Sequence, residues 1–437
     1  MKWLLYNFLF TIAYFAMLPK FLLRMARRGG YANRFADRFG RYPADVLAKL
    51  RDGTRRVWVH AVSVGEVAVA GQLMDEWRRQ CPEAAFVLSV TSSTGWTQAQ
   101  RQVRERDVLI HAPLDFPPCV RRALRAIRPE AYVITETELW PNVIRLATKQ
   151  CIPVFLVNAR ISDHSAPGYR RLRCWFGPVL NRLSRIYAQS DLDAKRLRDA
   201  GCEAERIEVT GSMKFDVAKR NPQKEADLRA YLAAAGIEPG ATLLLGGSTW
   251  PGEDEFMLSV YAEARKTNPA LRLIIAPRHF ELADAVEKNI LAAGFPCLRK
   301  SKTPNPVPQP QDAVVLADTT GELMGLYGLA DVAFVGKSLW EHGAQNMIEP
   351  CLCGCATLVG PHTENFRPVM SDLLAHEALL QGEHAADAKE KLLALLASPE
   401  KAKALGQRAT QAVQARVGVV PRIVADILAR LPRETTA

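Results

Sequence analysis

Short apolar runs alternate with amphipathic stretches along the chain from about residue 55 onwards. Six runs in the first half predict strands, at 57–62, 86–90, 108–111, 132–135, 154–157 and 186–188. The amphipathic stretches between them predict helices of about ten residues. Strands that alternate with helices are typical of βαβ units, so this half is expected to form a doubly wound parallel sheet.

The same pattern returns in the second half after a pause. Between residues 211 and 222, Gly-Ser and Asn-Pro pairs flank a charged stretch and predict an interdomain linker. Five further strands are predicted, at 242–245, 271–276, 313–316, 332–335 and 356–359. We therefore expect an α/β protein with two Rossmann-like domains that face each other across a cleft. The expected boundaries are 30–212 for the first domain, 213–410 for the second and 411–437 for a C-terminal helical segment.

Residues 1–29 have the composition of a membrane anchor. Residues 3–18 carry no charge and are almost all apolar, and Lys20, Arg24, Arg27 and Arg28 follow them. The apolar stretch is slightly shorter than the roughly 20 residues that cross a bilayer, so a short span and an interfacial helix both remain open. The basic flank predicts that the rest of the chain is cytoplasmic. An apolar helix packed on the protein's own core is the third interpretation.

The charge balance indicates an anionic partner. The chain has 57 basic and 46 acidic residues, a formal net charge of +11. Nucleic acid, an anionic membrane surface and a phosphorylated substrate all fit this charge, but basic and aromatic residues are not interleaved as nucleic-acid platforms require. Arg160 follows a predicted strand and suits phosphate recognition, although a solvated basic face explains it equally well. The nine cysteines show no paired framework, which favours a reduced, intracellular protein.

Carboxylates follow two of the predicted strands in the first half. Ser63 and Gly65 make a tight turn, and Glu66 begins the next helix. A glutamate at a helix start either caps the helix or acts as a catalytic base, and both roles stay open. Glu136 and Glu138 lie beyond another strand, where burial of both charges is costly without partners. We expect this pair to face a cleft, with a capping surface pair as the alternative.

Several polar turns follow strands in the second half. They comprise Gly246 to Thr249, Pro277-Arg278-His279, Thr320 to Leu323 and Gly343 to Pro350. Helix starts after glycine turns can bind a phosphate through backbone N–H groups, and Glu349 suits the hydroxyls of a ribose. Because these turns all fall at the expected strand ends of one domain, they favour a nucleotide site.

Nine runs of this sequence resemble a known family. They are 60–66, 136–142, 158–162, 211–216, 247–255, 277–279, 321–323, 346–350 and 360–363. In the same order, they are similar to the runs of the 3-deoxy-D-manno-octulosonic acid (Kdo) transferases of lipopolysaccharide synthesis. The resemblance spans nearly the whole chain. Two departures stand out, Lys337 where the family often has glycine, and Ala344-Gln345 in place of a usual Gly-His pair.

The resemblance implies an inverting glycosyltransferase of the GT-B fold that needs neither a metal nor a cofactor. Such an enzyme moves Kdo from CMP-Kdo to the lipid A precursor, lipid IV-A, at the cytoplasmic face of the bacterial inner membrane. Its partners are the donor, the acceptor and the anionic membrane surface, with no nucleic acid. The implied general base is Glu66, and Glu138 and Lys214 match groups that steady the transition state. The implied CMP contacts are Pro277, Arg278, Gly321, Glu322, Leu323, Asn346, Met347, Ile348 and Glu349. The candidates for acceptor binding are Ser63, Gly65, Glu136 and Arg160.

Other interpretations remain at this stage. A GT-B transferase that uses a UDP-sugar on a lipid acceptor is the nearest, and a non-catalytic, membrane-attached nucleotide- or lipid-binding protein is another. Asp191 and Asp193 match the DxD pattern of metal-dependent glycosyltransferases, but they are better explained as a helix cap after Ser190. Cys351, Cys353 and Cys355 are spaced more closely than zinc ligands usually are and are expected to be small buried thiols.

Overall fold

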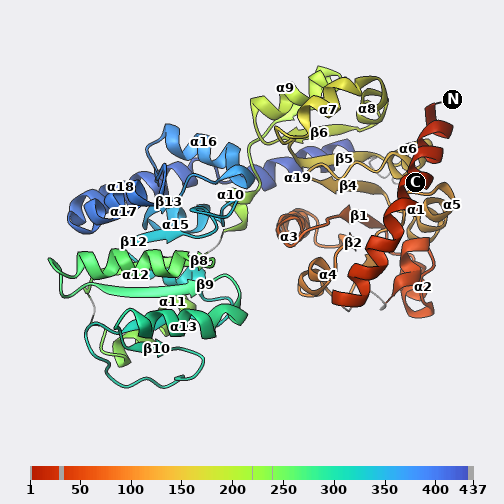
Figure 1. Cartoon of the computed structure of the whole chain (residues 1–437). Helices are drawn as coiled ribbons and strands as arrows, with labels where there is room; N and C mark the ends of the chain where they lie inside the picture. The colour runs from red at the N-terminus through yellow and green to blue at the C-terminus, as the bar shows by residue number, and fades with distance from the viewer. Residues whose placement is uncertain (1, 29–33, 219, 239, 432–437) are drawn as a thin grey trace. The chain divides into compact units, whose positions relative to one another are not determined.

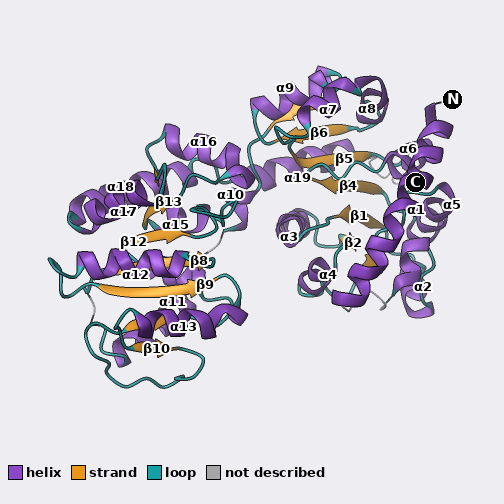
Figure 2. Ribbon diagram, viewed as in Figure 1, coloured by secondary structure: helices purple, strands orange, loops and turns teal. Residues whose placement is uncertain are grey.

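The computed structural model describes residues 2–28, 34–218, 220–238 and 240–431. The side chains of residues 2 and 20–28 lie outside this description, and they include the basic side chains on which the predicted orientation depends. The chain forms two compact units (Figures 1 and 2). Unit 1 comprises Met1–Val217 and Gly418–Ala437, and unit 2 comprises Ala218–Val417.

Unit 1 is built on a seven-stranded parallel sheet in the order β3-β2-β1-β4-β5-β6-β7. Its strands are β1 (Arg56–His60), β2 (Ala85–Val90), β3 (Val108–His111), β4 (Ala131–Thr135), β5 (Val154–Ala159), β6 (Arg185–Ala188) and β7 (Ile207–Val209). The central strands are buried along their whole length, as expected for apolar runs that are covered on both faces. The six predicted strands are confirmed, and β7 is an additional edge strand.

Helices cover both faces of this sheet. They are α1 (Lys2–Arg28), α2 (Ala44–Leu50), α3 (Val64–Gln80), α4 (Ser93–Ala99), α5 (Pro117–Ile127), α6 (Pro141–Lys149), α7 (Ala166–Arg171), α8 (Arg173–Leu180), α9 (Asp191–Asp199), α10 (Lys214–Val217) and α19 (Val419–Arg430), with the 3-10 helices η1 (Phe35–Phe39) and η2 (Ala204–Arg206). One apolar core joins the sheet to α2, α5, α6, α8 and α9. A second core joins the opposite face to α3, α4 and α19.

Unit 2 repeats the plan with a second seven-stranded parallel sheet, ordered β10-β11-β9-β8-β12-β13-β14. Its strands are β8 (Leu243–Thr249), β9 (Arg272–Pro277), β10 (Cys297–Arg299), β11 (Val314–Leu316), β12 (Val332–Val335), β13 (Ala356–Val359) and β14 (Leu380–Gln381). The five predicted strands are confirmed, and β10 and β14 are added at the edges. The prediction of two doubly wound α/β domains therefore holds.

The helices of unit 2 also lie in two layers. They are α11 (Pro222–Ala234), α12 (Glu253–Ala264), α13 (Ala283–Ala292), α14 (Leu323–Leu329), α15 (Ile348–Cys353), α16 (Arg367–Ala375), α17 (Ala385–Leu396) and α18 (Pro399–Gln414), with the 3-10 helices η3 (Phe280–Leu282) and η4 (Glu364–Phe366). The layer of α12, α13, α17 and α18 shares one apolar core with the sheet. The layer of α11 and α14 shares the other.

The C-terminal sequence divides between the units, which differs from the separate helical segment expected at 411–437. Helix α18 belongs to unit 2, whereas α19 belongs to unit 1. The apolar stripe of α19, which includes Val420, Ile423 and Ile427, is buried against the same sheet face as α3. Asp216 fixes the start of α19, because its carboxylate accepts hydrogen bonds from the backbone N–H groups of Gly418 (2.6 Å) and Val420 (2.7 Å).

Helix α1 packs on unit 1 through one face. The Tyr6 hydroxyl donates to the buried Asp115 carboxylate (2.8 Å), and the Phe10 ring meets Phe116 edge-on with centroids 5.1 Å apart. Large apolar side chains lie exposed elsewhere on the helix, namely Leu4, Leu5, Phe8, Leu9, Ile12, Phe15 and Met17. In the described ranges of the chain, we find no helix with both the length and the apolar character needed to cross a membrane.

Candidate functional site

The candidate site of unit 1 lies where the strand order reverses, between β1 and β4. Open parallel sheets bind ligands at this switch point, beyond the carboxyl ends of the strands. Glu66 follows β1 on α3, and Glu136 and Glu138 follow β4. The topology thus brings together the two groups of carboxylates that the sequence predicts at strand ends.

Glu66 is a buried carboxylate that accepts four hydrogen bonds. Its Oε1 accepts from the backbone N–H (3.2 Å) and the hydroxyl (2.8 Å) of Ser63. Its Oε2 accepts from the backbone N–H of Val62 (3.0 Å) and the hydroxyl of Thr135 (3.1 Å). Ser63 Oγ also accepts from the Glu66 N–H, which completes a capping box at the start of α3. Glu66 therefore caps the helix and stands at the switch point, so the two roles that the sequence left open are compatible.

Glu136 links this carboxylate group to two cations. It forms ion pairs with Arg160 (Nε to Oε2, 3.5 Å) and with Lys214 at the start of α10 (Nζ to Oε1, 3.5 Å). Its backbone lies in the left-handed region, with φ of 53°. Non-glycine residues in that conformation are strained and cluster at functional sites. The structure therefore joins Glu136, Arg160 and Lys214, which the sequence indicated only separately.

Glu138 is a carboxyl with a raised pKa. Partial burial raises the pKa of Glu138 from 4.5 to about 7, and the negative charges of Glu66 and Glu136 act in the same direction. A carboxyl with a pKa close to the working pH is well suited to take and release a proton. The choice that the sequence left open between Glu136 and Glu138 thus has a chemical basis, because one is ion-paired and the other is poised to titrate.

The turn that carries Gly65 is open to solvent. Gly65 is exposed, and a Cβ at position 65 would meet nothing nearer than Ser63 Oγ at 4.0 Å. The protein's own packing therefore does not require glycine at this position. Residues 63–65 are all exposed, so this turn at the start of α3 is accessible to a ligand.

Unit 2 has a matching arrangement at its own switch point, between β8 and β12. Sequence reasoning missed its organising residue, Glu253 at the start of α12. The buried Glu253 carboxylate accepts from the backbone N–H groups of Trp250 (2.8 Å), Lys337 (2.8 Å), Ser338 (3.0 Å) and Leu339 (3.1 Å). It thereby ties the turn after β8 to the loop after β12. The signal in the sequence was limited to an acidic residue at a helix start, because three of its four partners come 84 to 86 residues later.

Arg278 and Glu349 form the polar centre of the expected nucleotide site. Arg278 follows Pro277, the last residue of β9, and Glu349 lies in the first turn of α15. Burial raises the pKa of Glu349, while a hydrogen bond from Asn346 Nδ2 (3.0 Å) and the positive charge of Arg278 oppose that rise. Met347 and Ile348 are completely buried, so neither of these two expected contacts presents a surface to a ligand in this structure.

The remaining expected contacts, Gly321, Glu322 and Leu323, lie at the start of α14. The Gly321 carbonyl accepts from Lys224 Nζ, and the Glu322 carboxylate pairs with Lys300 Nζ, each at 2.9 Å. A cavity of about 620 Å³ lies beside them, and its lining includes Glu322, Thr320, Lys224, Lys300 and Tyr231. Arg278 and Glu349 do not line it. Of the expected donor contacts, Glu322 alone lines this cavity.

The two departures from the family pattern share one backbone feature. Lys337 has φ of 58° and Ala344 has φ of 54°, both in the left-handed region that favours glycine. Each places a Cβ where glycine carries none, at a cost of roughly 1 kcal/mol or more. The loop is nevertheless closed by backbone hydrogen bonds from Ala344 to Lys337 (2.8 Å) and from Gln345 to Gly336 (3.0 Å).

The alternative metal motifs have structural roles. Ser190 caps α9 by accepting from the backbone N–H of Asp193, and the buried Asp193 carboxylate accepts from the Ile161 N–H (3.0 Å). Cys351 and Cys355 are buried, and burial raises the pKa of each thiol, to about 12 for Cys351. The prediction that the DxD match is a helix cap is confirmed.

Comparisons with known proteins agree on one family. Residues 33–217 match the family model of the 3-deoxy-D-manno-octulosonic-acid transferases (kdotransferases). A 3-deoxy-D-manno-octulosonic acid transferase of Bordetella pertussis is 36% identical over 431 residues, 94% of this chain and 96% of the relative. The protein of that name from Haemophilus influenzae is 30% identical over 399 residues, 91% of each chain.

The fold of this chain also occurs in proteins with other names. The structure of a UDP-GlcNAc 2-epimerase from Neisseria meningitidis matches 86% of this chain and 100% of its own, with a TM-score of 0.54. Its sequence identity is only 14%, so this likeness shows the fold alone. It agrees with the GT-B arrangement of two Rossmann-like domains in one chain.

Proposed function

The chain belongs to the 3-deoxy-D-manno-octulosonic acid (Kdo) transferase family, and on that premise we propose that it transfers Kdo from CMP-Kdo to the lipid A precursor, lipid IV-A, with inversion at the anomeric carbon. The observation that carries the proposal is the carboxylate group at the switch point of unit 1. Glu66, Glu136 and Glu138 gather there with Lys214 and Arg160, as a transferase for a hydroxyl acceptor requires.

The chemical step needs a base, because a sugar hydroxyl is a poor nucleophile at neutral pH. As the acceptor oxygen bonds to the anomeric carbon of Kdo, its proton passes to a carboxylate and CMP leaves with the bonding electrons. A positioned base contributes about 10²–10⁴ in rate. We assign this role to Glu66, whose four hydrogen bonds fix its orientation beside the open Gly65 turn.

One structural observation favours a second candidate for the base. The pKa of Glu138 is raised to about 7, chiefly by burial, which makes its carboxylate a stronger proton acceptor than an ordinary glutamate. In this variant of the proposal, Glu138 takes the proton. Glu66 holds the turn, and its negative charge adds to the effect of burial in raising the pKa of Glu138. Both versions use the same site and the same reaction.

Unit 2 is assigned to the donor. Departure of CMP builds negative charge on its phosphate, and the guanidinium of Arg278 is suited to bind that charge. The Glu349 carboxylate, oriented by Asn346, suits the hydroxyls of the ribose. Glu253 contributes indirectly, because it holds the loop between β12 and Asn346 in place.

We assign the acceptor to unit 1 and the working location to the cytoplasmic face of the bacterial inner membrane. The exposed apolar face of α1 supports attachment as an interfacial helix, the second of the forms considered from the sequence. The formal charge of +11 supports attraction to anionic lipid and to the phosphates of the lipid A precursor. Ser63, Gly65, Glu136 and Arg160 are the proposed acceptor contacts.

Donor consumption tests this proposal. Purified full-length protein is mixed with lipid A precursor and either CMP-Kdo or a panel of UDP-sugars, and nucleotide release is followed by chromatography. We expect CMP release that depends on the acceptor, and no UDP release. Release of UDP alone would identify a UDP-sugar transferase instead, and absence of release with every donor would indicate a binding protein without catalysis.

A further inference from the structure

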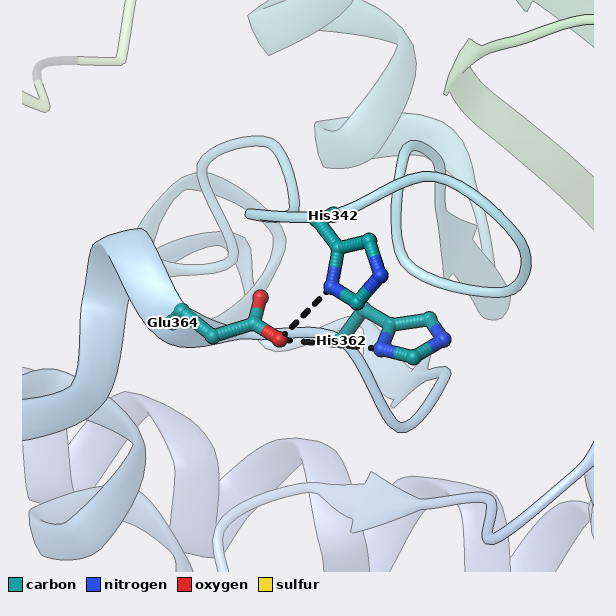
Figure 3. Close-up of side chains that lie close together, drawn as sticks. All are labelled: His342, His362 and Glu364. Atoms are coloured by element: carbon teal, nitrogen blue, oxygen red, sulfur yellow. Dashed lines mark hydrogen bonds and ion pairs between the residues drawn. The ribbon is translucent and has the colours of Figure 1, made fainter. Parts of the chain in front are cut away.

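Three side chains with metal-binding groups meet on unit 2. His342, His362 and Glu364 point toward one another, and their ligand atoms all lie within 4.8 Å (Figure 3). Among the residues that the structure describes, this is the one group of three or more such side chains with that spacing. The proposed transfer reaction uses none of them.

The two loops that supply these residues are held together by their own backbone. His342 lies on the loop after β12, His362 lies on the loop after β13, and Glu364 begins the 3-10 helix η4 that follows that second loop. The His362 N–H donates to the Ser338 carbonyl (3.0 Å), and the Gly360 N–H donates to Ser338 Oγ (2.8 Å). The positions of the three side chains thus rest on a fixed framework, which favours binding because little ordering is needed.

The loops also touch beside His342. Gly343 has φ of 114°, and a Cβ there would stand 2.2 Å from Asn365 Nδ2, so a larger residue would require the Asn365 side chain to move. Gly343 thus packs closely against the second loop, one residue away from both His342 and Ala344. Ala344 and Gln345 then close the first loop through the backbone hydrogen bonds described above.

The distances suit a small divalent cation. Glu364 Oε1 lies 3.0 Å from His342 Nδ1 and 3.6 Å from His362 Nδ1. Ligands at about 2.0 Å from a tetrahedral zinc ion are about 3.3 Å from one another. Both observed distances lie close to that value, and the two imidazole rings are already near, with centroids 4.1 Å apart.

The ligand types of these three side chains also match the preference of zinc. Two imidazoles and one carboxylate are a ligand set of zinc and of neighbouring transition metals, whereas magnesium and calcium prefer oxygen alone. His342 and Glu364 are exposed, with 73% and 43% of their side-chain surfaces accessible, and His362 is partly exposed at 30%. An ion can therefore enter from solvent, and its fourth position stays open to water.

We propose that His342, His362 and Glu364 bind one zinc-class divalent cation that bridges the loops after β12 and β13. The ion takes no part in the transfer step. It replaces the hydrogen bond between His342 and Glu364 with three metal–ligand bonds and thereby braces the loop that leads to Asn346. Because the site is defined by these three residues alone, its test does not depend on the proposed transferase activity.

The test is a zinc titration of full-length protein, free of any tag and stripped of metal by a chelator that is then removed. Calorimetry is performed on the parent and on the variants His342→Ala, His362→Ala and Glu364→Gln. His376→Ala is the matched control, because His376 also lies beside a carboxylate, Asp372 (3.8 Å), but without a second imidazole. A cobalt titration followed by visible absorption separates imidazole and carboxylate ligation from binding at the exposed Cys151 and Cys174.

We expect one zinc per chain in the parent and in His376→Ala, and at least about a tenfold loss of affinity in each of the three ligand variants. Zinc should also raise the melting temperature of the parent and of the control, but not of the ligand variants. Melting curves without metal check that every variant is folded. Equal affinity in parent and ligand variants, an equal loss in the control, or no binding to the parent would each overturn the proposal.

Discussion

The hydroxyl of Thr135 at the end of β4 donates to the carboxylate of Glu66 on α3, at 3.1 Å. The same hydroxyl faces the His60 carbonyl of the neighbouring strand β1 at 2.9 Å, so one hydrogen serves two acceptors. Glu66 is thus held from its own turn and from the adjacent strand at once. This places a fixed carboxylate at the switch point of unit 1, where the proposed acceptor hydroxyl must lose its proton.

Substitution of this carboxylate tests its chemical role. We expect Glu66→Gln to reduce Kdo transfer by at least about 100-fold, since an amide cannot take the acceptor's proton. CMP affinity should be unchanged, because the residues assigned to CMP belong to unit 2. Transfer rate and CMP affinity are measured on the same preparation.

A second variant, which loses a helix cap elsewhere, separates the capping role of Glu66 from its catalytic role. The amide that replaces the Glu66 carboxylate has one oxygen for four donors, so the variant should also lose about 1–3 kcal/mol of stability. Ser190→Ala removes the cap of α9 and is expected to cost about 1 kcal/mol while leaving transfer intact. A Glu66→Gln protein that is less stable but transfers Kdo near the parent rate would make Glu66 structural and move the base to Glu138.

The protonation of Glu138 predicts a dependence of stability on pH. Its pKa rises from 4.5 to about 7 on folding, so the folded state binds this proton more tightly than the unfolded state. Its contribution to stability is therefore fully present below about pH 4.5 and is lost as the pH rises through about 7. Urea unfolding of parent and Glu138→Gln at pH 5 and pH 8 should show that the parent loses stability relative to the variant over this range.

The same substitution discriminates between the two candidate bases. If Glu138 takes the proton, the parent's rate falls as the pH drops below about 7, and Glu138→Gln abolishes both the rate and this limb. If Glu66 is the base, Glu138→Gln retains part of the activity. A difference in stability between the two proteins that stays constant with pH would contradict the raised pKa.

The donor assignment predicts two selective losses. Arg278→Ala removes a charged phosphate contact and should weaken CMP binding by about 1.5–3 kcal/mol, roughly 10- to 100-fold. Glu349→Ala should weaken it through the ribose, by a smaller factor. Lys302→Ala, which removes an exposed cation paired with Glu287 in the same unit, is the control. Calorimetry with CMP gives all three values, and unchanged affinity in both donor variants would place the nucleotide elsewhere.

The exposed face of α1 predicts how the protein meets lipid. We expect Leu4→Gln, Phe8→Gln and Phe15→Gln combined to reduce binding to anionic vesicles by at least about tenfold, since each loses apolar surface that would enter the interface. Leu291→Gln, at an exposed apolar residue of unit 2, is the control. Vesicle sedimentation measures the binding. Equal sedimentation of all variants would show that this face does not contact the membrane.

Point substitutions are preferable to removal of residues 1–29. Deletion of the helix releases the protein from membranes in this account, but it also removes the Tyr6 hydrogen bond to Asp115. The Asn7 contact with Asn142 (2.7 Å) is lost as well. The truncated unit 1 is therefore expected to be less stable, which a fall in melting temperature would reveal.

Apolar periodicity predicts the central strands well because burial on both faces leaves continuous runs, as in β1, β4, β8 and β12. It fails for β7, β10 and β14, which have only two or three residues and exist because a neighbouring strand offers a free edge. The stripe of α19 predicts a packed helix, but no local signal says which sheet it covers. Long-range partners decide that, as Asp216 does by capping α19 from 202 residues earlier in the chain.

The residues of the candidate sites likewise divide into those that the sequence reveals and those that depend on long-range contacts. Glu66, Glu136 and Glu138 are visible in the sequence because each follows a strand directly. The role of Glu253 is not visible, since its backbone donors come from a loop 84 to 86 residues later. Nor is the meeting of His342 with Glu364, which depends on the parallel pairing of β12 and β13.

The most direct test of the central claim is the mass of the lipid product. Full-length protein is incubated with CMP-Kdo and lipid A precursor, and the lipid is extracted and analysed by mass spectrometry. The account predicts a mass increase by one or more Kdo units, absent without CMP-Kdo and strongly reduced with Glu66→Gln. Precursor of unchanged mass, with folded protein and intact donor, would contradict it.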